Sequence, residues 1–366
     1  MKIKKNKILT LVNLGGPRSV SEIEVFLSDL FLDPFVFDLP LPEFLRQKLA
    51  KFIAKKRAPK VAKKYESMGF GGASPLVSET EKQAKVLQST LNLNSEFKWK
   101  VQIAMACGYP NIRDSKFSKP SPNEIYLPLY PQFSRSTVLS TYNILYNKFG
   151  ECPIGSGGIV PNFGNDPKYW KLYADFLIEY FLGKLNEKQF LHYDIYPKGK
   201  DWREMNLVFS AHGIPMRLVK KGDKYLEEVA SNVKGIIAQL KSQGFKGSFY
   251  ISFQSKVGPA KWTEPNTIQV IENLAKQKKD IAVIPISFVS DHLETLEEIG
   301  EEFREIAIGN GANSFYRIPA FGVYPKFIEY LAGIVLEADK KVTSCVCLEL
   351  GGQSLDQCRF KNRANS

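Results

Sequence analysis

Short apolar runs alternate with amphipathic stretches along nearly the whole chain. The runs have the length of buried strands and lie at residues 8–13, 100–105, 124–128, 207–210, 248–253 and 281–288. Apolar residues recur at helical spacing in residues 168–185, 225–243, 267–277 and 325–338. This alternation predicts an α/β protein with parallel sheets flanked by helices on both faces.

The predicted elements fall into two similar halves. Residues 152–166 are rich in Gly and Pro and are the best candidate for a linker. We therefore expect an N-terminal α/β domain at 1–155 and a second one at 156–324. The helix at 325–340 follows the second domain and is expected to pack back on the first, and residues 341–366 form a polar tail.

Composition narrows the class of protein. The chain has 366 residues, of which 44% are hydrophobic and 24% charged, as is ordinary for soluble globular proteins. No window of about 18 uninterrupted apolar residues indicates a membrane span. The apolar run near the start breaks at Asn13 without a cleavage site, which argues against a signal peptide. Five scattered cysteines fit a reducing cytoplasm better than a disulfide framework.

The net charge of +12 is unevenly distributed. Residues 46–64, here called the basic segment, carry nine Lys and Arg residues and no acidic residue. Residues 26–45, here called the apolar lip, are dense in Phe and Leu. They predict either a core helix followed by a Pro-broken loop or a surface for lipid or a flat apolar ligand. An apolar lip beside a basic segment favours an amphiphile with acidic groups, or an anionic membrane, over nucleic acid.

Two predicted strands end at side chains suited to chemistry. His212 comes just after the run at 207–210, and ligands of open parallel sheets bind at the carboxyl ends of the strands. The run at 281–288 leads to Asp291, His292 and Glu294. Asp291 and Glu294 have the spacing of a capping box, which alone would explain the glutamate. An imidazole and a carboxylate at two strand ends nevertheless predict a shared site.

Several motifs in register resemble the ferrochelatase family. They are LVNLGGP at 11–17, FLSDLFLDPFVFDLP at 26–40, YESMGFGGASPL at 65–76, LPLYPQFSRST at 127–137, SAHGIPM at 210–216, SFQSKVGPAKWTEP at 252–265 and PISFVSDHLETLEEI at 285–299. The resemblance implies two Rossmann-like, chelatase-type domains with the active-site cleft between them. It also implies a lyase of haem biosynthesis that inserts Fe²⁺ into protoporphyrin IX, or alternatively into coproporphyrin III, with release of two pyrrole protons.

The resemblance also assigns roles to residues. The family's catalytic and metal-binding histidine and glutamate fall on His212 and Glu294, with either one as base or metal ligand, and Asp291 and His292 support them. The segments that border the porphyrin in relatives contain Tyr65, Ser74, Tyr130 and Ser134, and two aromatic positions near the cleft, also suited to packing, fall on Trp262 and Phe288. Proton acceptance and divalent-metal binding both suit an imidazole and a carboxylate.

One departure from the family's pattern, one predicted cluster and two alternative functions remain. Ala106 stands where many members have an arginine, so the basic segment is expected to replace that charge. Some ferrochelatases carry an iron–sulfur cluster on C-terminal cysteines, which would place one on Cys345, Cys347 and Cys358, with Cys152 as a further ligand. The alternative functions are a cobalt chelatase of the same superfamily and a non-catalytic porphyrin- or haem-binding protein. The expected location is the cytoplasm, with a peripheral contact at the inner membrane.

Overall fold

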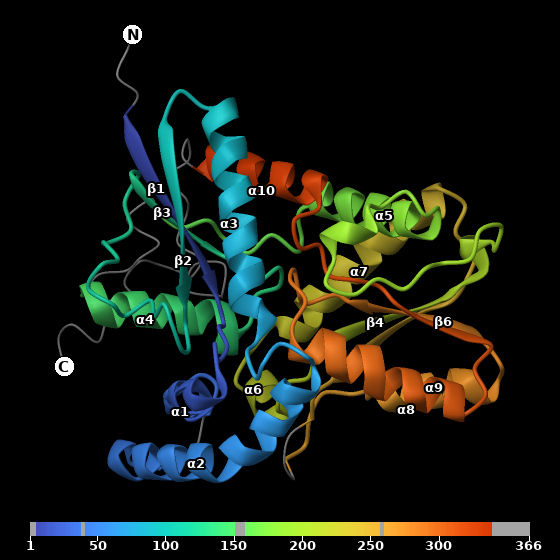
Figure 1. Ribbon diagram of the computed structural model, residues 1–366, viewed down its shortest axis with the longest axis horizontal. Coiled ribbons are helices and arrows are strands. Elements are labelled where there is room, and N and C mark those ends of the chain that lie inside the picture. The colour runs from blue at the N-terminus through green and yellow to red at the C-terminus, as the bar shows by residue number, and fades with distance from the viewer. Residues whose placement is uncertain (1–4, 38–40, 151–157, 257–259, 339–366) are drawn as a thin grey trace. The chain divides into compact units, whose positions relative to one another are not determined.

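The computed structural model describes residues 5–37, 41–150, 158–256 and 260–338. The chain divides into two compact units. The first comprises Met1–Leu129, Arg135–Asn162 and Pro325–Ser366, and the second comprises Tyr130–Ser134 and Phe163–Tyr324. Within the described residues each unit holds one parallel sheet with helices packed on it, as Figure 1 shows. The α/β class with parallel, helix-flanked sheets is therefore confirmed.

The sheet of the first unit has the strand order β2-β1-β3. Its strands are β1 (Asn6–Asn13), β2 (Lys98–Met105) and β3 (Glu124–Pro128), all parallel. Leu9, Leu11 and Val12 of the central strand are fully buried, which explains its continuous apolar run. All three predicted strands are confirmed, although β1 and β2 each begin two residues earlier than the apolar run.

The first unit contains five α-helices among its described residues. They are α1 (Ile23–Leu32), α2 (Glu43–Ser67), α3 (Pro75–Asn94), α4 (Ser140–Phe149) and α10 (Pro325–Ala338), with a 3₁₀ turn at Val20–Glu22 and a π-helical turn at Arg135–Leu139. Helix α3 packs on β1 and β2, and α10 packs on α3 (Figure 1). Residues from the end of the chain thus complete the first unit's core.

The apolar lip consists of two different structures. Its first part lies in α1, which buries Phe26, Leu27 and Phe31, so the interpretation as a core helix is confirmed there. Its last part begins α2, where 61% of Phe44 is exposed. Apolar surface of the lip is therefore concentrated at the start of α2.

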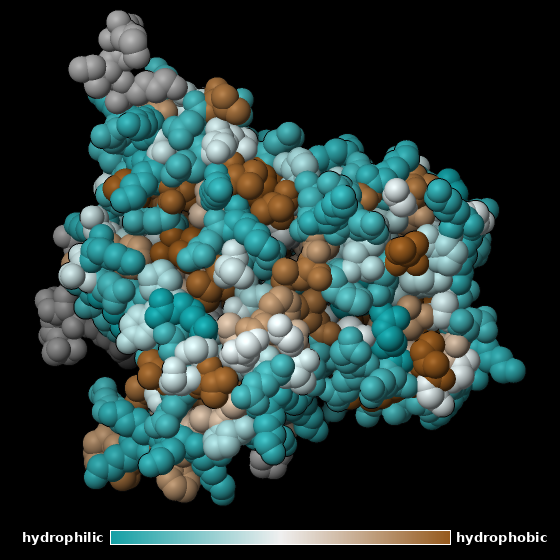
Figure 2. Space-filling model, in the orientation of Figure 1, coloured by the Kyte–Doolittle hydropathy of each residue, from teal (hydrophilic) through white to brown (hydrophobic). Residues whose placement is uncertain are grey.

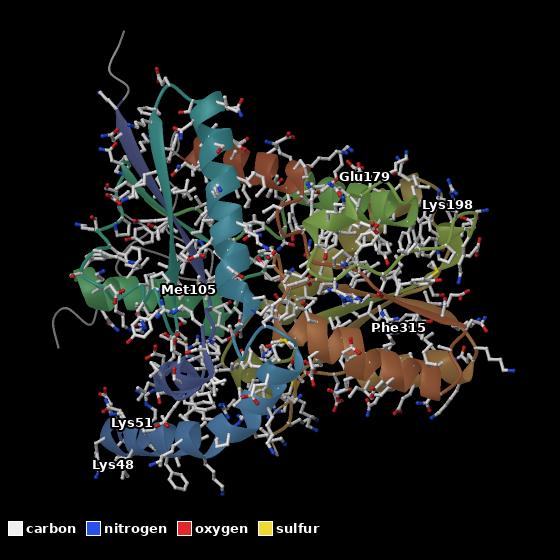
Figure 3. The ribbon with its side chains drawn as sticks, viewed as in Figure 1. Lys48, Lys51, Met105, Glu179, Lys198 and Phe315 are labelled. Carbon is white, nitrogen blue, oxygen red and sulfur yellow. The ribbon has the colours of Figure 1, made fainter. Side chains whose placement is uncertain are left out.

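The basic segment lies entirely on α2. Ala50 and Ala54 face the protein, whereas Phe52 is 64% exposed among the lysines. Figure 2 shows separate hydrophobic side chains within a mostly hydrophilic surface where α2 lies, and Figure 3 shows Lys48 and Lys51 on this helix. The positive charge predicted from the sequence is thus carried by one largely exposed helix.

The sheet of the second unit has the strand order β5-β4-β6-β7, again parallel. Its strands are β4 (Asn206–His212), β5 (Phe249–Gln254), β6 (Asp280–Pro285) and β7 (Ser314–Arg317). Strand β6 ends at Pro285, three residues before the predicted end, because the Phe288 N–H bonds back to the Pro285 carbonyl in a turn. Strand β7 was not predicted, since four residues are too few for a recognisable apolar pattern.

The helices of the second unit precede β4 or lie between the strands along the chain. They are α5 (Pro167–Phe181), α6 (Met216–Lys220), α7 (Tyr225–Ser242), α8 (Thr267–Lys276), a π-helix (Glu294–Glu302) and α9 (Phe303–Gly309), with 3₁₀ turns at Glu187–Gln189 and Trp202–Glu204. Helix α5 is shorter than predicted because the chain leaves it at Gly183, which has a φ of +61°. No helix in the described part of the chain is both long and apolar enough to cross a bilayer.

Candidate functional site

His212 is the last residue of β4, which lies between β5 and β6 in the second sheet. Leu207, Val208 and Phe209 of this strand are fully buried, whereas 39% of the His212 side chain is exposed. The chain turns directly afterwards, where Pro215 pairs with Trp262. The strand thus runs two residues beyond the predicted 207–210, and His212 lies at its carboxyl end rather than after it.

The imidazole of His212 is hydrogen-bonded to the carboxylate of Glu294. Nδ1 of His212 lies 2.8 Å from Oε2 of Glu294. An ionised carboxylate can only accept hydrogen bonds, so Nδ1 must carry the proton and donate it. In a neutral imidazole of this tautomer, Nε2 is then the basic nitrogen that can accept a proton or bind a metal ion.

The contact shifts the pKa values of both groups. Burial disfavours the charged imidazole, but the carboxylate of Glu294 outweighs it and raises the pKa of His212. Burial also opposes ionisation of Glu294, but the charge and hydrogen bond of His212 outweigh it and lower the pKa of Glu294 to about 2. Glu294 is therefore ionised over the whole physiological range, as the tautomer assignment requires.

A second carboxylate, Glu298, lies on the same face of the π-helix. The Ser255 hydroxyl donates to Oε2 of Glu298 at 2.5 Å and lies 3.2 Å from Oε2 of Glu294. The Ser255 N–H donates to Oε1 of Glu298 at 2.8 Å. Burial and the neighbouring Glu294 charge raise the pKa of Glu298. One serine thus bridges two carboxyl groups whose pKa values are shifted in opposite directions.

Gln254 connects these carboxylates to the sheet. It is the β5 residue paired with His212, and its Nε2 donates to the Glu294 carbonyl and to Oε2 of Glu298, both at 3.1 Å. Its Oε1 accepts from the Ser210 hydroxyl at 2.6 Å. The amide orientation is therefore fixed from both sides, and it ties the start of the π-helix to the strand beside His212.

The capping-box interpretation of Asp291 and Glu294 is wrong. The helix begins after Leu293, and His292, expected in its first turn, precedes it. The Thr295 hydroxyl accepts from the His292 N–H at 2.9 Å, and Leu293 at the N-cap position makes no side-chain capping bond. Asp291 instead accepts from Arg317, so the two carboxylates are used elsewhere.

His292 lies beside the pair in a more apolar setting. Its ring packs edge-on against Phe288, with centroids 4.6 Å apart, and its Nδ1 lies 3.2 Å from the Ser290 carbonyl. Burial lowers the pKa of His292 although the nearby carboxylates oppose this effect. Two imidazoles with oppositely shifted pKa values therefore flank Glu294.

Trp262, the other predicted aromatic residue, is half-buried and packs close to Gly213.

The four residues predicted to border a porphyrin are all buried. Tyr65 lies in α2 and is 5% exposed, and the Ser74 hydroxyl caps α3 by accepting from the Leu76 N–H. Tyr130 is 8% exposed, and the Ser134 hydroxyl donates to Asp223 at 3.0 Å. These contacts give Ser74 and Ser134 structural roles, and a contact of any of the four with substrate stays a prediction.

Ala106, which stands where an arginine was expected, has the cationic side chain of Arg113 beside it. Arg113 donates from Nη1 to the Ala106 carbonyl oxygen at 2.8 Å. The sequence suggested the basic segment as the replacement, but Arg113 is the guanidinium found beside this position.

The predicted iron–sulfur ligands Cys152, Cys345, Cys347 and Cys358 lie outside the described residues. Within the described residues, no group of three or more His, Cys, Asp or Glu side chains is arranged to hold a metal ion. A divalent ion held by His212 and Glu294, the predicted metal ligands, would therefore need further ligands from substrate or water.

Sequence reasoning missed Gln254, Ser255 and Glu298. Gln254 and Ser255 follow the apolar run at 248–253, so the strand-end rule used for His212 also points to them. Glu298 lies four residues after Glu294, a spacing that places both on one helix face. The positive φ of Ser255, +63°, has no such signal, because only the folded backbone shows it.

Comparisons with known proteins identify relatives over nearly the whole chain. The family model described as ferrochelatase matches residues 7–339. A ferrochelatase of Leptospira biflexa is 64% identical over 98% of this chain and 99% of its own. One from Leptospira borgpetersenii is 53% identical over 95% and 96% of the two chains, and one from Pelagibacter ubique is 34% identical over 91% and 92%.

Proposed function

The chain belongs to the ferrochelatase family, and we propose that it inserts Fe²⁺ into protoporphyrin IX with His212 and Glu294 as its catalytic pair. Coproporphyrin III is the alternative porphyrin. The reaction replaces two pyrrole N–H protons with the metal ion, so the protein must accept protons beside the ring. The observation that carries the proposal is the His212–Glu294 contact at a strand end.

His212 accepts a pyrrole proton at Nε2. Since Nδ1 is committed to the Glu294 carboxylate, the lone pair of the neutral imidazole lies on Nε2. The adjacent negative charge stabilises the imidazolium that forms, which is why the pKa of His212 is raised. A positioned base of this kind contributes roughly 10²–10⁴-fold to the rate.

Glu294 also provides a carboxylate for the incoming Fe²⁺, or passes the proton onward. Ser255 lies between Glu294 and Glu298, so its hydroxyl can relay a proton from one carboxyl group to the other. Glu298 suits the receiving position because burial and the Glu294 charge raise its pKa. Ferrous iron is a substrate of this site rather than a resident cofactor.

A peripheral contact with an anionic membrane completes the proposal. Its support is the exposed Phe44 at the start of α2 and the exposed Phe52 within the basic segment. Apolar side chains can enter the headgroup region while lysines meet anionic lipids. A cobalt chelatase or a non-catalytic porphyrin carrier is not favoured, because the ferrochelatase match covers nearly the whole chain.

The experiment is anaerobic metal insertion, followed by the loss of porphyrin fluorescence, with ferrous iron and each of the two porphyrins. His212→Ala and Glu294→Gln should each lower turnover by roughly two or more orders of magnitude. Glu301→Gln serves as the matched control for the carboxylate, because Glu301 is exposed. Porphyrin binding should persist in all three variants, as an apolar ring is held mainly by buried area.

Three results would contradict the proposal. An active His212→Ala protein would exclude the assigned base, and near-normal turnover of Glu294→Gln would exclude the role of the carboxylate. Tight porphyrin binding by the parent protein without any insertion of iron would identify a carrier instead.

A further inference from the structure

Arg317, the last residue of β7, is a fully buried arginine. Its Nη1 donates to Oδ1 of Asp291 at 2.8 Å, and its Nη2 donates to the His192 carbonyl at 2.5 Å. The Arg317 backbone N–H donates to Oδ2 of Asp194 at 2.6 Å. One side chain thus connects the end of a strand to two segments that are distant in the sequence.

The contact with Asp291 fixes the approach to the π-helix. Asp291 is 4% exposed and lies three residues before Glu294. Its Oδ1 also accepts from the Ala320 N–H at 3.3 Å. The chain just before Glu294 is therefore attached to β7 and to the segment that follows β7.

Arg317 also lies against the π-helix further along. A Cβ atom on Gly300 would lie 3.3 Å from Cδ of Arg317, closer than most real contacts of this kind. The absence of a side chain at Gly300 thus lets the helix rest on the arginine stem. Arg304, in the helix that follows, donates from Nε to the Gly300 carbonyl at 3.0 Å and from Nη2 to Asp194.

We infer that Arg317 is a positioning residue for the reaction, which sets the π-helix and hence the Glu294 carboxylate against His212. It contacts the segment before Glu294 through Asp291 and the segment after it at Gly300. The inference rests on the proposed role of Glu294. Stability alone does not require this arrangement, because apolar replacement of a whole buried ion pair is often neutral or stabilising.

Replacing both charges together separates positioning from stability. Arg317→Met with Asp291→Leu removes the pair without leaving an unpaired buried charge. We expect the double variant to fold, to keep the KM for porphyrin within about threefold, and to lose about 10–100-fold in kcat, the scale for a misplaced catalytic group. The matched control is Lys200→Met with Asp280→Leu, an ion pair of 2.6 Å at the start of β6, far along the strand from the site. Its kcat should stay unchanged.

Arg317→Lys provides a second test if the double variant does not fold. Lysine keeps the charge, but a single ammonium group does not reproduce the fork that reaches both Asp291 and His192. Turnover of this variant should fall while hydrogen exchange of the peptide spanning residues 290–303 becomes faster. Normal kcat in either folded Arg317 variant would overturn the inference. A fully active Glu294→Gln would instead contradict the proposed catalytic role of Glu294. Failure of the positioning role is thus distinguished from failure of the proposed function.

Discussion

Ser255 offers a perturbation in which stability and catalysis should change independently. Its φ of +63° is a left-handed conformation that costs a residue with a Cβ atom roughly 1–2 kcal/mol. Its hydroxyl donates to the Glu298 carboxylate and lies within hydrogen-bonding distance of Glu294. Hydrogen bonds to charged groups contribute about 1.5–3 kcal/mol each. The strain persists because the folded site uses the hydroxyl.

Ser255→Ala removes the hydroxyl and keeps the strain, so it should destabilise the protein by about 1.5–3 kcal/mol. Ser255→Gly removes the same hydroxyl but relieves the strain, at a small cost in unfolded-state entropy. We therefore expect the glycine variant to be about 1 kcal/mol more stable than the alanine variant. Turnover should fall alike in both, by about tenfold or more, because each 1.4 kcal/mol of lost transition-state stabilisation is a factor of ten.

Thermal unfolding measures the difference in stability between the two variants, and the initial rate of anaerobic metal insertion measures their turnover. Ser242→Ala is the control, since the Ser242 hydroxyl is exposed and donates to the Gln239 carbonyl of its own helix. Full turnover of Ser255→Gly would show that the hydroxyl does not position the carboxylates. An alanine variant more stable than the glycine variant would refute the argument from strain.

Four further outcomes are expected. In Glu294→Gln the imidazole loses the charge that raises the pKa of His212, so the acidic limb of the residual kcat/KM profile should move to lower pH. The raised pKa of His212 stabilises the folded protein below 6.5, and the lowered pKa of Glu294 stabilises it above 4.5. Both contributions are present between these two pH values and both are lost in Glu294→Gln. Chemical denaturation should therefore find the largest loss of stability of this variant between pH 4.5 and 6.5. Sedimentation with anionic vesicles should weaken in high salt and in Lys48→Glu with Lys51→Glu, and no binding at low salt would exclude a lipid contact of α2. Arg113→Ala should raise the KM for porphyrin with little change in kcat, and an unchanged KM would show that Arg113 does not replace the missing arginine.

The sequence predicted the position of His212 for a physical reason. A buried parallel strand is apolar along its length, so the first polar residue after it marks the end of the strand and the edge where ligands bind. The same rule placed Glu294 near that edge. It could not place Glu294 at 2.8 Å from His212, because this distance depends on where the π-helix begins.

The wrong capping-box interpretation and the missed Arg317 have one cause, which is that contacts between distant segments leave no local pattern. The spacing of Asp291 and Glu294 fits a capping box, but a buried arginine takes the first carboxylate and a histidine takes the second. Neither partner lies near these residues in the sequence. Arg317 ends a strand of four residues, so no apolar pattern announced it. Contacts between distant segments thus decided between two interpretations that local spacing left open.

The two reacting groups are held by elements of unequal regularity. His212 ends a strand that is hydrogen-bonded on both sides, so its backbone position is set by the sheet. Glu294 begins a π-helix, a geometry that is rare and occurs frequently at functional sites. Such a helix needs side chains to fix its position. Gln254, the β5 residue paired with His212, supplies one such contact by donating to the Glu294 carbonyl. The end of β5, paired with the strand end that carries the base, therefore also helps to fix where the carboxylate lies.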